Sequence, residues 1–341
     1  MQNPIAKIPL YLTFDDVLLL PQHSEFLPSA VSTKTQFTKN LTLNLPFISA
    51  AMDTVTESKM AIAMAKSGGI GVLHRSLSPE TQADEVRKVK RASSIIIREP
   101  ITVDINIPLS NAKELMLKNK ISGLPVIDKH NKLVGILTSR DIKSATTKTS
   151  TIQEVMTTSL ITAQEPVNVT AAKELMLKNK IEKLPLIDKG KLVGLMTLRD
   201  ISQVDKYPLV NVDDSGHLKV AAAVGTDEST EKRIAFLVQA GVDAIIIDTA
   251  HGHSQKVIDT FKMVRAQYSD LEIVVGNIAT QQAAKELIEL GVDALKVGIG
   301  PGSICTTRII AGVGAPQLSA IQDVYSVAKN SDIPIIADGG I

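Results

Sequence analysis

One ten-residue segment occurs twice in this chain without a substitution, at Ala112–Ile121 and at Ala172–Ile181. Each copy continues with a Leu-Pro-x-Ile-Asp segment and then a Gly-x-x-Thr-x-Arg-Asp segment, which ends at Asp141 in the first copy and at Asp200 in the second. Apolar residues at helical spacing, followed by short β-branched runs, predict a β-α-β-β-α unit in each copy. Because such a unit is too small to be stable alone, the two copies are expected to pack against each other.

The tandem units resemble two cystathionine-β-synthase-type (CBS) modules, the arrangement called a Bateman domain. The resemblance covers residues 94–206, with one module at 94–150 and the other at 151–206. In that family the threonine and aspartate of the closing segment hold the ribose of an adenine or guanine nucleotide. The resemblance therefore implies a regulatory nucleotide at Thr138, Asp141, Thr197 and Asp200. The alternative is that both aspartates only cap the helices that follow them.

Strand-like apolar runs alternate with helix-like stretches on both sides of the repeat, at residues 47–53, 69–74, 218–224, 244–248, 272–276, 294–298 and 333–338. Such alternation predicts a parallel sheet covered by helices. Polar side chains follow nearly every run at its carboxyl end: Asp53, His74, Asp248, Asn277, Cys305 and Asp338. This pattern favours a (β/α)8 TIM barrel, whose active site lies at the carboxyl ends of its strands, over an open doubly wound sheet.

The predicted barrel comprises residues 1–93 and 207–341, with the CBS pair inserted after the second strand and its helix. Seven strand-like runs precede the end of the sequence at Ile341, whereas a closed TIM barrel needs eight strands. We therefore expect a C-terminally incomplete sequence whose barrel does not close unaided.

The charge balance and the cysteine count argue against several classes of protein. Lys and Arg total 37 against 36 Asp and Glu, so no broad attraction to nucleic acid or to an anionic membrane is expected. No apolar run reaches the roughly 18 residues of a membrane helix, and the first residues lack the layout of a signal peptide. A single cysteine forms no intrachain disulfide, which suits a reducing cytoplasm. We expect a cytoplasmic protein that recognises a small ligand locally.

That single cysteine, Cys305, lies in a glycine-rich loop, Gly298–Arg308, directly after an apolar run. Glycines let the backbone approach a ligand closely, and hydroxyl groups beside a thiol suit a nucleophile. A lone cysteine is ordinarily an inert small hydrophobic residue. A packing role, however, needs neither the glycines before it nor the Thr-Thr-Arg sequence after it, so Cys305 is the candidate nucleophile.

Five segments together resemble inosine-5′-monophosphate (IMP) dehydrogenase of the bacterial type, and the resemblance covers the whole chain. They are the loop around Cys305, Ala50–Glu57, Asp248 with His251 and His253, Gly276–Asn277, and Ala337–Ile341. The resemblance implies oxidation of IMP to xanthosine monophosphate with NAD⁺, through a covalent adduct on the cysteine, in guanine nucleotide synthesis.

The resemblance also implies a role for each matching residue. The catalytic residues are the nucleophile Cys305 and Thr307, which positions the hydrolytic water. The IMP-binding residues are Ser303, Asp338, Gly339, Gly340, Met52 and Asn277. The NAD-binding residues are Asp248, Gly298 and Gly300, and a potassium ion is bound by the backbone carbonyls of Gly300, Gly302 and Cys305. A homotetramer is implied, with pairing into octamers left open. Because the family's flap and catalytic arginine follow Ile341, the chain by itself is expected to be inactive.

Alternative interpretations remain for the whole chain and for single residues. GMP reductase shares the barrel and the cysteine loop but ordinarily lacks the CBS pair, and a non-catalytic CBS nucleotide sensor with a remnant barrel is also possible. Asp53 and Asp248 could be helix N-caps. His251 and His253 lack a matching third metal ligand, so we expect loop histidines there.

Overall fold

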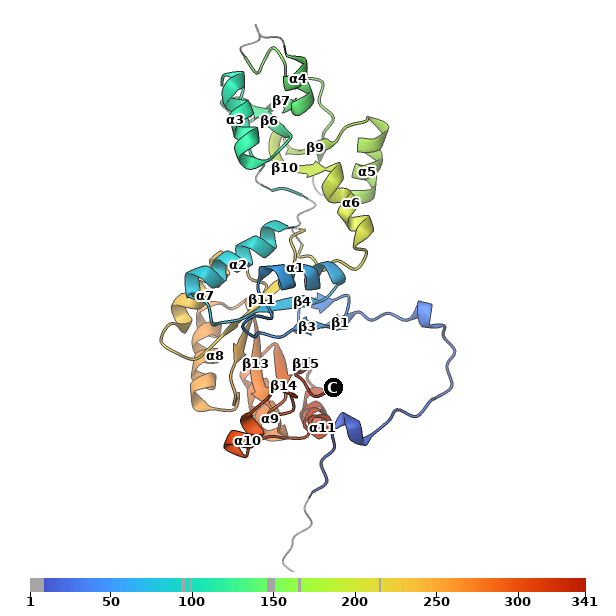
Figure 1. The fold of residues 1–341 in the computed structure, drawn as a ribbon, viewed down its shortest axis with the longest axis vertical. Helices are drawn as coiled ribbons and strands as arrows, with labels where there is room; N and C mark the ends of the chain where they lie inside the picture. Colours follow the sequence, from blue (N-terminus) through green and yellow to red (C-terminus); the bar gives the residue numbers. More distant parts are fainter. Residues whose placement is uncertain (1–8, 93–95, 99, 146–150, 165–166, 215) are drawn as a thin grey trace, which may run out of the picture. The chain divides into compact units, whose positions relative to one another are not determined.

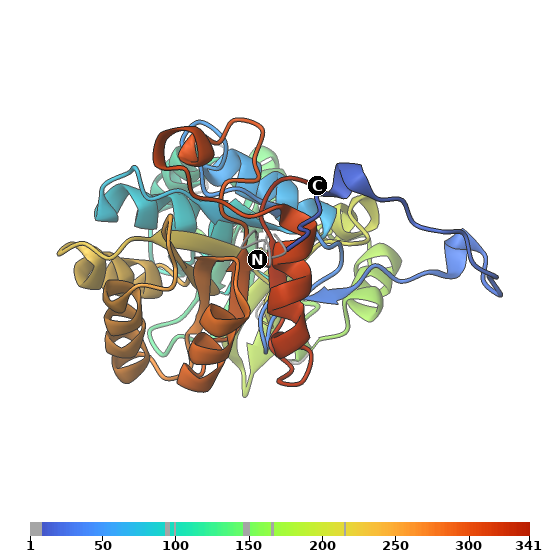
Figure 2. The same cartoon turned by 90° about the horizontal axis from the view of Figure 1, so that it is seen from below.

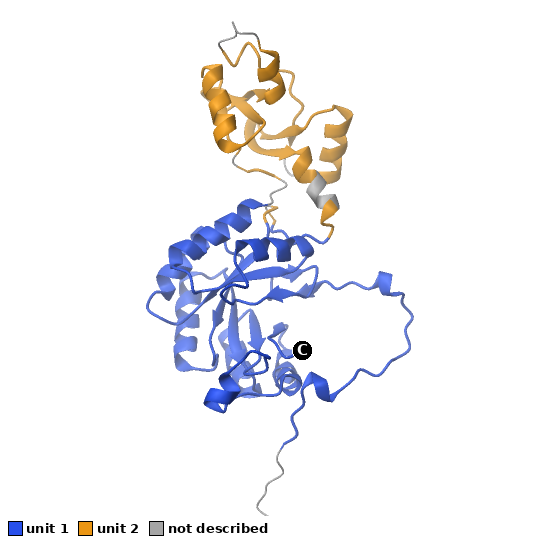
Figure 3. Ribbon diagram, viewed as in Figure 1, with its two compact units in different colours: residues 1–92, 209–213, 218–341 blue, residues 93–208, 214–217 orange. Residues whose placement is uncertain are grey.

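The computed structural model describes residues 9–92, 96–98, 100–145, 151–164, 167–214 and 216–341. The chain divides into two compact units (Figure 3). Unit 1 comprises residues 1–92, 209–213 and 218–341, and unit 2 comprises residues 93–208 and 214–217. Among the described residues, no helix combines the length and the apolar character needed to cross a membrane.

Unit 1 is built on a parallel sheet whose strand order follows the order of the chain. The strands are β3 (Ile48–Ser49), β4 (Ile70–Leu73), β11 (Val220–Val224), β12 (Ala244–Asp248), β13 (Glu272–Ile278), β14 (Ala294–Val297) and β15 (Ile335–Ala337). An open doubly wound sheet has a point at which the strand order reverses, and this sheet has none. It is a curled half-barrel consistent with a TIM barrel, which confirms the predicted fold class at this level (Figure 1).

Helices follow the strands and cover the outer face of this sheet (Figures 1 and 2). They are α1 (Ser58–Ser67), α2 (Pro79–Ala92), α7 (Thr230–Gln239), α8 (Gln255–Gln267), α9 (Gln281–Leu290), the short α10 (Thr307–Ala311) and α11 (Gln317–Ala328). Before the sheet come two 3-10 turns, η1 (Phe14–Asp16) and η2 (Pro28–Ala30), and a hairpin of β1 (Thr35–Gln36) and β2 (Thr42–Leu43).

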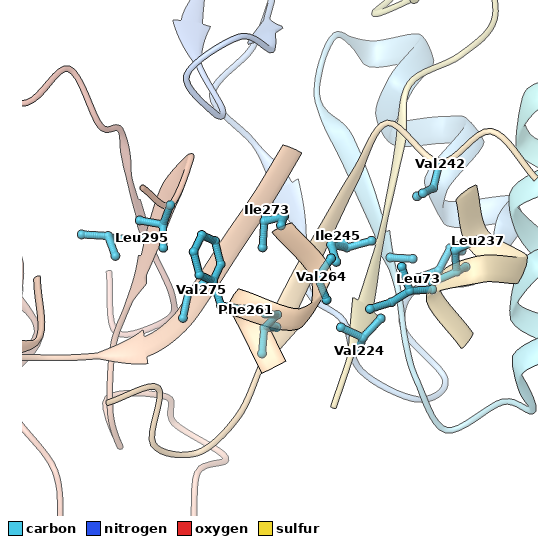
Figure 4. Close-up of a cluster of buried hydrophobic side chains, with 14 of the residues drawn as sticks. Leu73, Val224, Leu237, Val242, Ile245, Phe261, Val264, Ile273, Val275 and Leu295 are labelled. Atoms are coloured by element: carbon cyan, nitrogen blue, oxygen red, sulfur yellow. The ribbon is translucent and has the colours of Figure 1, made fainter. Parts of the chain in front are cut away.

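Both faces of the sheet are buried, because successive side chains of a strand point to opposite sides and both kinds are apolar here. On the outer face, Ile245 and Val275 belong to one buried cluster with Phe261 of α8 (Figure 4). On the inner face, Ile246 and Val274 belong to a second cluster, which also contains side chains of the β1–β2 hairpin region. The alternation therefore fixes which strand residues point into the half-barrel.

Unit 2 contains two copies of one β-α-β-β-α arrangement, as the repeat predicts. The first copy is β5 (Val103–Asp104), α3 (Leu109–Asn119), β6 (Gly123–Ile127), β7 (Leu133–Thr138) and α4 (Ser139–Ser144). The second copy is β8 (Ala163–Gln164), α5 (Val169–Lys178), β9 (Lys183–Asp188), β10 (Lys191–Thr197) and α6 (Leu198–Lys206). Each copy has its own buried apolar cluster. The copies contact each other through a backbone bridge between Lys132 and Lys191 and a 2.8 Å hydrogen bond from Lys183 Nζ to Ser122 Oγ.

Candidate active site

A cavity of about 670 Å³ lies at the carboxyl edge of the unit 1 sheet, where the strands end and their loops begin. The sequence-predicted residues that line it are Met52, Asp248, Asn277, Gly298, Gly300, Gly302, Ser303, Cys305, Thr307, Asp338, Gly339 and Gly340. These are all the candidate catalytic, substrate, cofactor and potassium residues. The fold therefore brings them together from five different strand ends and their loops.

A second cavity, of about 550 Å³, adjoins the first and shares part of its lining. The shared residues include Asp248, Asn277, Lys296, Cys305, Thr307 and Asp338. Ser303, Gly339 and Gly340 line only the first cavity, whereas Arg75, Ser76, Thr249 and Ala250 line only the second. Cys305 thus lies where two spaces of ligand size meet.

The cysteine loop leaves β14 through glycines whose backbone conformations disfavour other residues. Gly298 has a φ of +142° and Gly300 a φ of +76°, a region that side chains rarely allow. A Cβ atom on Gly298 would lie 2.5 Å from the backbone oxygen of Asp338. The loop and the end of β15 are thus in close backbone contact.

Gln317 of α11, buried to 1% exposure, also joins these two strand ends. Its Nε2 donates hydrogen bonds to the backbone oxygens of Val297, at 3.0 Å, and Asp338, at 3.3 Å. The backbone N–H of Asp338 donates to Val297 as well, at 2.8 Å. Sequence reasoning did not identify Gln317, because nothing in its local pattern distinguishes it from an ordinary polar residue in the first turn of a helix.

The thiol of Cys305 is half-buried, and its Sγ lies 3.3 Å from Thr307 Oγ1, to which it donates a hydrogen bond. When the thiol is ionised, the hydroxyl of Thr307 turns to donate to the sulfur, as does its backbone N–H, and these bonds hold the pKa of Cys305 below its usual value. Since the thiolate is the reactive form of cysteine, this environment suits a nucleophile.

A lysine links three of the predicted polar residues. Lys296 Nζ donates to Asp338 Oδ2 at 2.7 Å, to Asp248 Oδ1 at 3.1 Å and to Asn277 Oδ1 at 3.2 Å. Asn277 Nδ2 in turn donates to Asp338 Oδ2 at 2.7 Å. The Lys296 side chain is only 14% exposed. Lys296 is therefore largely buried among these polar side chains.

Strand register could have revealed this lysine. In β14, Leu295 and Val297 belong to the outer cluster and Ala294 to the inner one. Because side chains alternate along a strand, Lys296 must point inward. A charged residue at an inward-pointing position of an otherwise apolar strand indicates a residue of the site, and this pattern can be recognised from the sequence.

The alternative roles for the other polar residues are resolved by their contacts. Asp53 and Asp248 are not helix N-caps, because α1 is capped at Glu57 and α8 at Ser254. His253 Nε2 pairs with Glu286 at 2.7 Å. In the part of the chain that the structure describes, His, Cys, Asp and Glu form no group of three that could bind a metal ion. His251 and His253 lie in the loop between β12 and α8.

Comparison with known proteins identifies the family. Residues 11–341 match the family model described as the IMP dehydrogenase / GMP reductase domain. The chain belongs to this family. Among curated relatives, the IMP dehydrogenase of Aquifex aeolicus is 52% identical over 98% of this chain and 69% of its own length. That of Staphylococcus epidermidis is 49% identical over 100% of this chain and 70% of its own length.

Solved structures of the IMP dehydrogenase / GMP reductase family include GMP reductase from Trypanosoma brucei. For a variant in complex with guanosine 5′-monophosphate, the TM-score is 0.84 and the sequence identity with this chain is 38%. The match covers 98% of this chain and 72% of the reductase chain. The complex with guanosine 5′-triphosphate has a TM-score of 0.83 and covers 98% of this chain and 82% of its own. Because these matches cover 98% of this chain, they extend over unit 2 as well as unit 1, so the insertion by itself does not distinguish a dehydrogenase from these reductases.

The two aspartates predicted to bind a regulatory nucleotide differ in their surroundings. Asp141 Oδ2 accepts the backbone N–H of Thr138, at 2.7 Å, and its hydroxyl, at 2.6 Å, in a capping box at the start of α4. Asp200 accepts the Thr197 hydroxyl at 2.5 Å. Each aspartate is the third residue of its helix, α4 or α6, and not the residue before it. Neither is therefore an N-cap, and each carboxylate accepts a hydrogen bond from the threonine that precedes the helix.

A cavity of about 530 Å³ in unit 2 is lined by Thr197 and Asp200 but not by Thr138 or Asp141. Its other polar lining residues are Lys120, Ser122, Glu182, Lys183 and Arg199. Burial lowers the pKa of Lys183, because removal from water disfavours its ammonium. An anionic ligand in this cavity would replace part of the lost solvation.

Proposed function

We propose that this protein oxidises IMP to xanthosine 5′-monophosphate with NAD⁺, in guanine nucleotide synthesis. The observation that carries the proposal is the position of Cys305, whose thiol of lowered pKa lies where two cavities meet. One cavity can hold the purine nucleotide and the other the nicotinamide, so that both reach the cysteine. The 52% identity with a curated IMP dehydrogenase supports the assignment.

The chemistry follows from a thiolate beside a bound purine. Cys305 Sγ bonds to C2 of hypoxanthine as the C2=N3 double bond opens and N3 takes up a proton. A hydride then passes from C2 to NAD⁺, giving NADH, and loss of the N3 proton restores the C2=N3 bond. Water attacks C2 of the resulting thioimidate, the C2–Sγ bond breaks, and xanthosine monophosphate leaves. Thr307, whose hydroxyl is 3.3 Å from the sulfur, positions this water. Each turnover consumes one IMP, one NAD⁺ and one water.

The remaining lining residues are assigned by chemistry and position. Ser303 and the backbone N–H groups of Gly339 and Gly340 hold the 5′-phosphate, and both glycines have left-handed φ values, of +72° and +70°. Successive N–H groups in such conformations form anion-binding concavities. Asp338 accepts the ribose hydroxyls of IMP, and Met52 and Asn277 contact the purine.

Asp248, Gly298 and Gly300 border the space for the nicotinamide riboside of NAD⁺. We further propose that the backbone carbonyls of Gly300, Gly302 and Cys305 bind a potassium ion. Carbonyl oxygens are the hard ligands that such a cation prefers. The Gly302 carbonyl accepts the N–H of Cys305 at 3.0 Å, and its second lone pair stays available.

Protection of Cys305 from alkylation tests the proposed substrate. The protein has one cysteine, so iodoacetamide labelling reports on this site alone, whether or not the 341-residue chain turns over by itself. We expect IMP to slow labelling at least tenfold at saturation, and the intact protein to form NADH from IMP and NAD⁺. Unchanged labelling with IMP would contradict the proposal. Oxidation of NADPH with GMP, and no NADH from IMP, would identify a GMP reductase instead.

We propose that residues 94–206 are a CBS pair inserted in a TIM barrel formed by residues 1–93 and 207–341. The repeated β-α-β-β-α order supports this assignment. We also propose that an adenine or guanine nucleotide binds this pair, with its phosphates near Lys120, Lys183 and Arg199.

A homotetramer is proposed as the assembly. Leu18, Leu19 and Leu20, each at least 80% exposed, are available to form an interface. The cytoplasmic location stays a prediction.

A matched pair of variants tests the nucleotide site. Asp141→Ala and Asp200→Ala each remove a carboxylate that accepts a hydrogen bond from the preceding threonine, which costs about 1 kcal/mol of stability. Only Asp200 lines the cavity of unit 2. We therefore expect ATP or GTP to raise the melting temperature of the unmodified protein and of Asp141→Ala, but not of Asp200→Ala. Equal nucleotide responses in all three proteins, measured by differential scanning fluorimetry, would contradict a site at Asp200.

A further inference from the structure

Lys296 connects two carboxylates that lead to different parts of the site. Asp338 is followed by Gly339 and Gly340, which line only the first cavity. Asp248 is followed by Thr249 and Ala250, which line only the second. The ammonium of Lys296 lies between them, 2.7 Å from one carboxylate and 3.1 Å from the other.

The charges of this cluster make the lysine indispensable to both aspartates. Two ionised carboxylates and one ammonium leave a net charge of −1 among three largely buried side chains, whose exposed fractions are 14%, 24% and 34%. Burial disfavours the ammonium, but the carboxylates of Asp248 and Asp338 more than offset this and raise the pKa of Lys296. Without it, two like charges would face each other with no neutralising group between them.

The hydrogen-bond pattern shows how a change at one carboxylate reaches the other. Asp338 Oδ2 accepts from both Lys296 and Asn277, while Asn277 Oδ1 accepts from Lys296. A ligand that adds hydroxyl donors to Asp338 competes with these donors. Lys296 is then free to bind Asp248 more closely, which reorients a second carboxylate, next to the Thr249 and Ala250 side of the second cavity.

We propose that Lys296 is a positioning residue that couples the two subsites, so that occupation of the IMP ribose site at Asp338 changes the affinity for the cofactor at Asp248. This inference rests on the proposed function, which assigns those two carboxylates to the two ligands. The coupling is reciprocal, because each ligand must change the affinity for the other by the same factor. Lys296 itself contacts no reacting atom in this scheme.

The test compares unmodified protein with Lys296→Met, Lys296→Arg and the surface control Lys285→Met, whose side chain is exposed on α9. The affinity for IMP is measured by protection of Cys305 from alkylation, with and without NADH, which accepts no hydride and so permits no turnover. We expect NADH to change the IMP affinity of the unmodified protein by about fivefold or more, within the usual range of coupling between sites.

Lys296→Met is expected to weaken binding of both ligands about tenfold or more, as loss of a charged hydrogen-bond partner does, and to abolish the effect of NADH. Lys296→Arg should retain the coupling, and Lys285→Met should behave as the unmodified protein. A purely structural role would not let Lys296→Arg restore the coupling that Lys296→Met loses.

The outcomes separate the coupling from the proposed function. If IMP fails to protect Cys305 in the unmodified protein, the proposed function is wrong. If IMP protects but NADH does not change its affinity, or if Lys296→Met keeps the coupling, the role of Lys296 is wrong. Should Lys296→Met fail to fold by circular dichroism, Lys296→Gln replaces it, with the same expected loss of coupling.

Discussion

Replacing Cys305 with alanine in the intact protein is expected to abolish NADH formation from IMP, with a fall in kcat of at least ~10⁴-fold. The reason is that the hydride leaves C2 only from the adduct in which the sulfur is bound, and no other cysteine exists in the chain to form it. Mass spectrometry of protein incubated with IMP and NAD⁺ should show a covalent adduct that is absent from Cys305→Ala. Turnover by Cys305→Ala at more than a few per cent of the original rate would refute the mechanism.

Thr307→Val is the matched variant for this prediction, because it keeps the shape of the side chain and removes the hydroxyl that bonds to the sulfur. Loss of that hydrogen bond raises the pKa of Cys305, so the pH at which alkylation accelerates should move upward. The adduct should still form in Thr307→Val, but its hydrolysis should be slow, since the water is no longer positioned. An unchanged pH profile of alkylation would show that Thr307 does not stabilise the thiolate.

Gly298→Ala is expected to disable the site even though it adds a single methyl group. The new Cβ would lie 2.5 Å from the backbone oxygen of Asp338 and 3.0 Å from Gln317 Nε2. Neither contact can be relieved without moving the end of β15 or the Gln317 amide that joins the two strands. Together with the φ of +142°, this should cost about 3 kcal/mol or more and displace both Cys305 and Asp338. We expect at least ~100-fold weaker protection of Cys305 by IMP, in line with that free energy.

Gly291→Ala provides the control at the other end of the same strand. Gly291 also has a left-handed φ, of +87°, but nothing lies within 4 Å of the position of its Cβ. It should lose about 1 kcal/mol of stability from backbone strain alone, while IMP still protects Cys305. Thermal unfolding and alkylation, measured on both variants, separate the two effects. Comparable loss of protection in Gly291→Ala would mean that strain in β14, and not the contact with Asp338, governs the site.

The parts of the fold that sequence alone predicted depend on local patterns. The repeated decapeptide predicted two units with one element order, and the structure has that order twice. The alternation of apolar runs with helical stretches predicted the seven strands and their parallel arrangement. The glycine-rich loop singled out Cys305, and all the residues assigned to its site line one cavity. These features can be predicted from sequence because residues only a few positions apart set the backbone conformation and the amphipathic periodicity.

Contacts between distant strands required the tertiary structure. The β14 pattern implies only that Lys296 points inward, whereas its partners Asp248 and Asp338 are 48 and 42 residues away in sequence. Asp141 and Asp200 likewise end the same sequence motif but have different surroundings. Asp141 belongs to a capping box, whereas Asp200 lines a cavity. Sequence determined which residue types stand at the strand ends. Only the register of the strands decided which carboxylates share one ammonium, because register depends on packing summed over the whole sheet and not on any one segment.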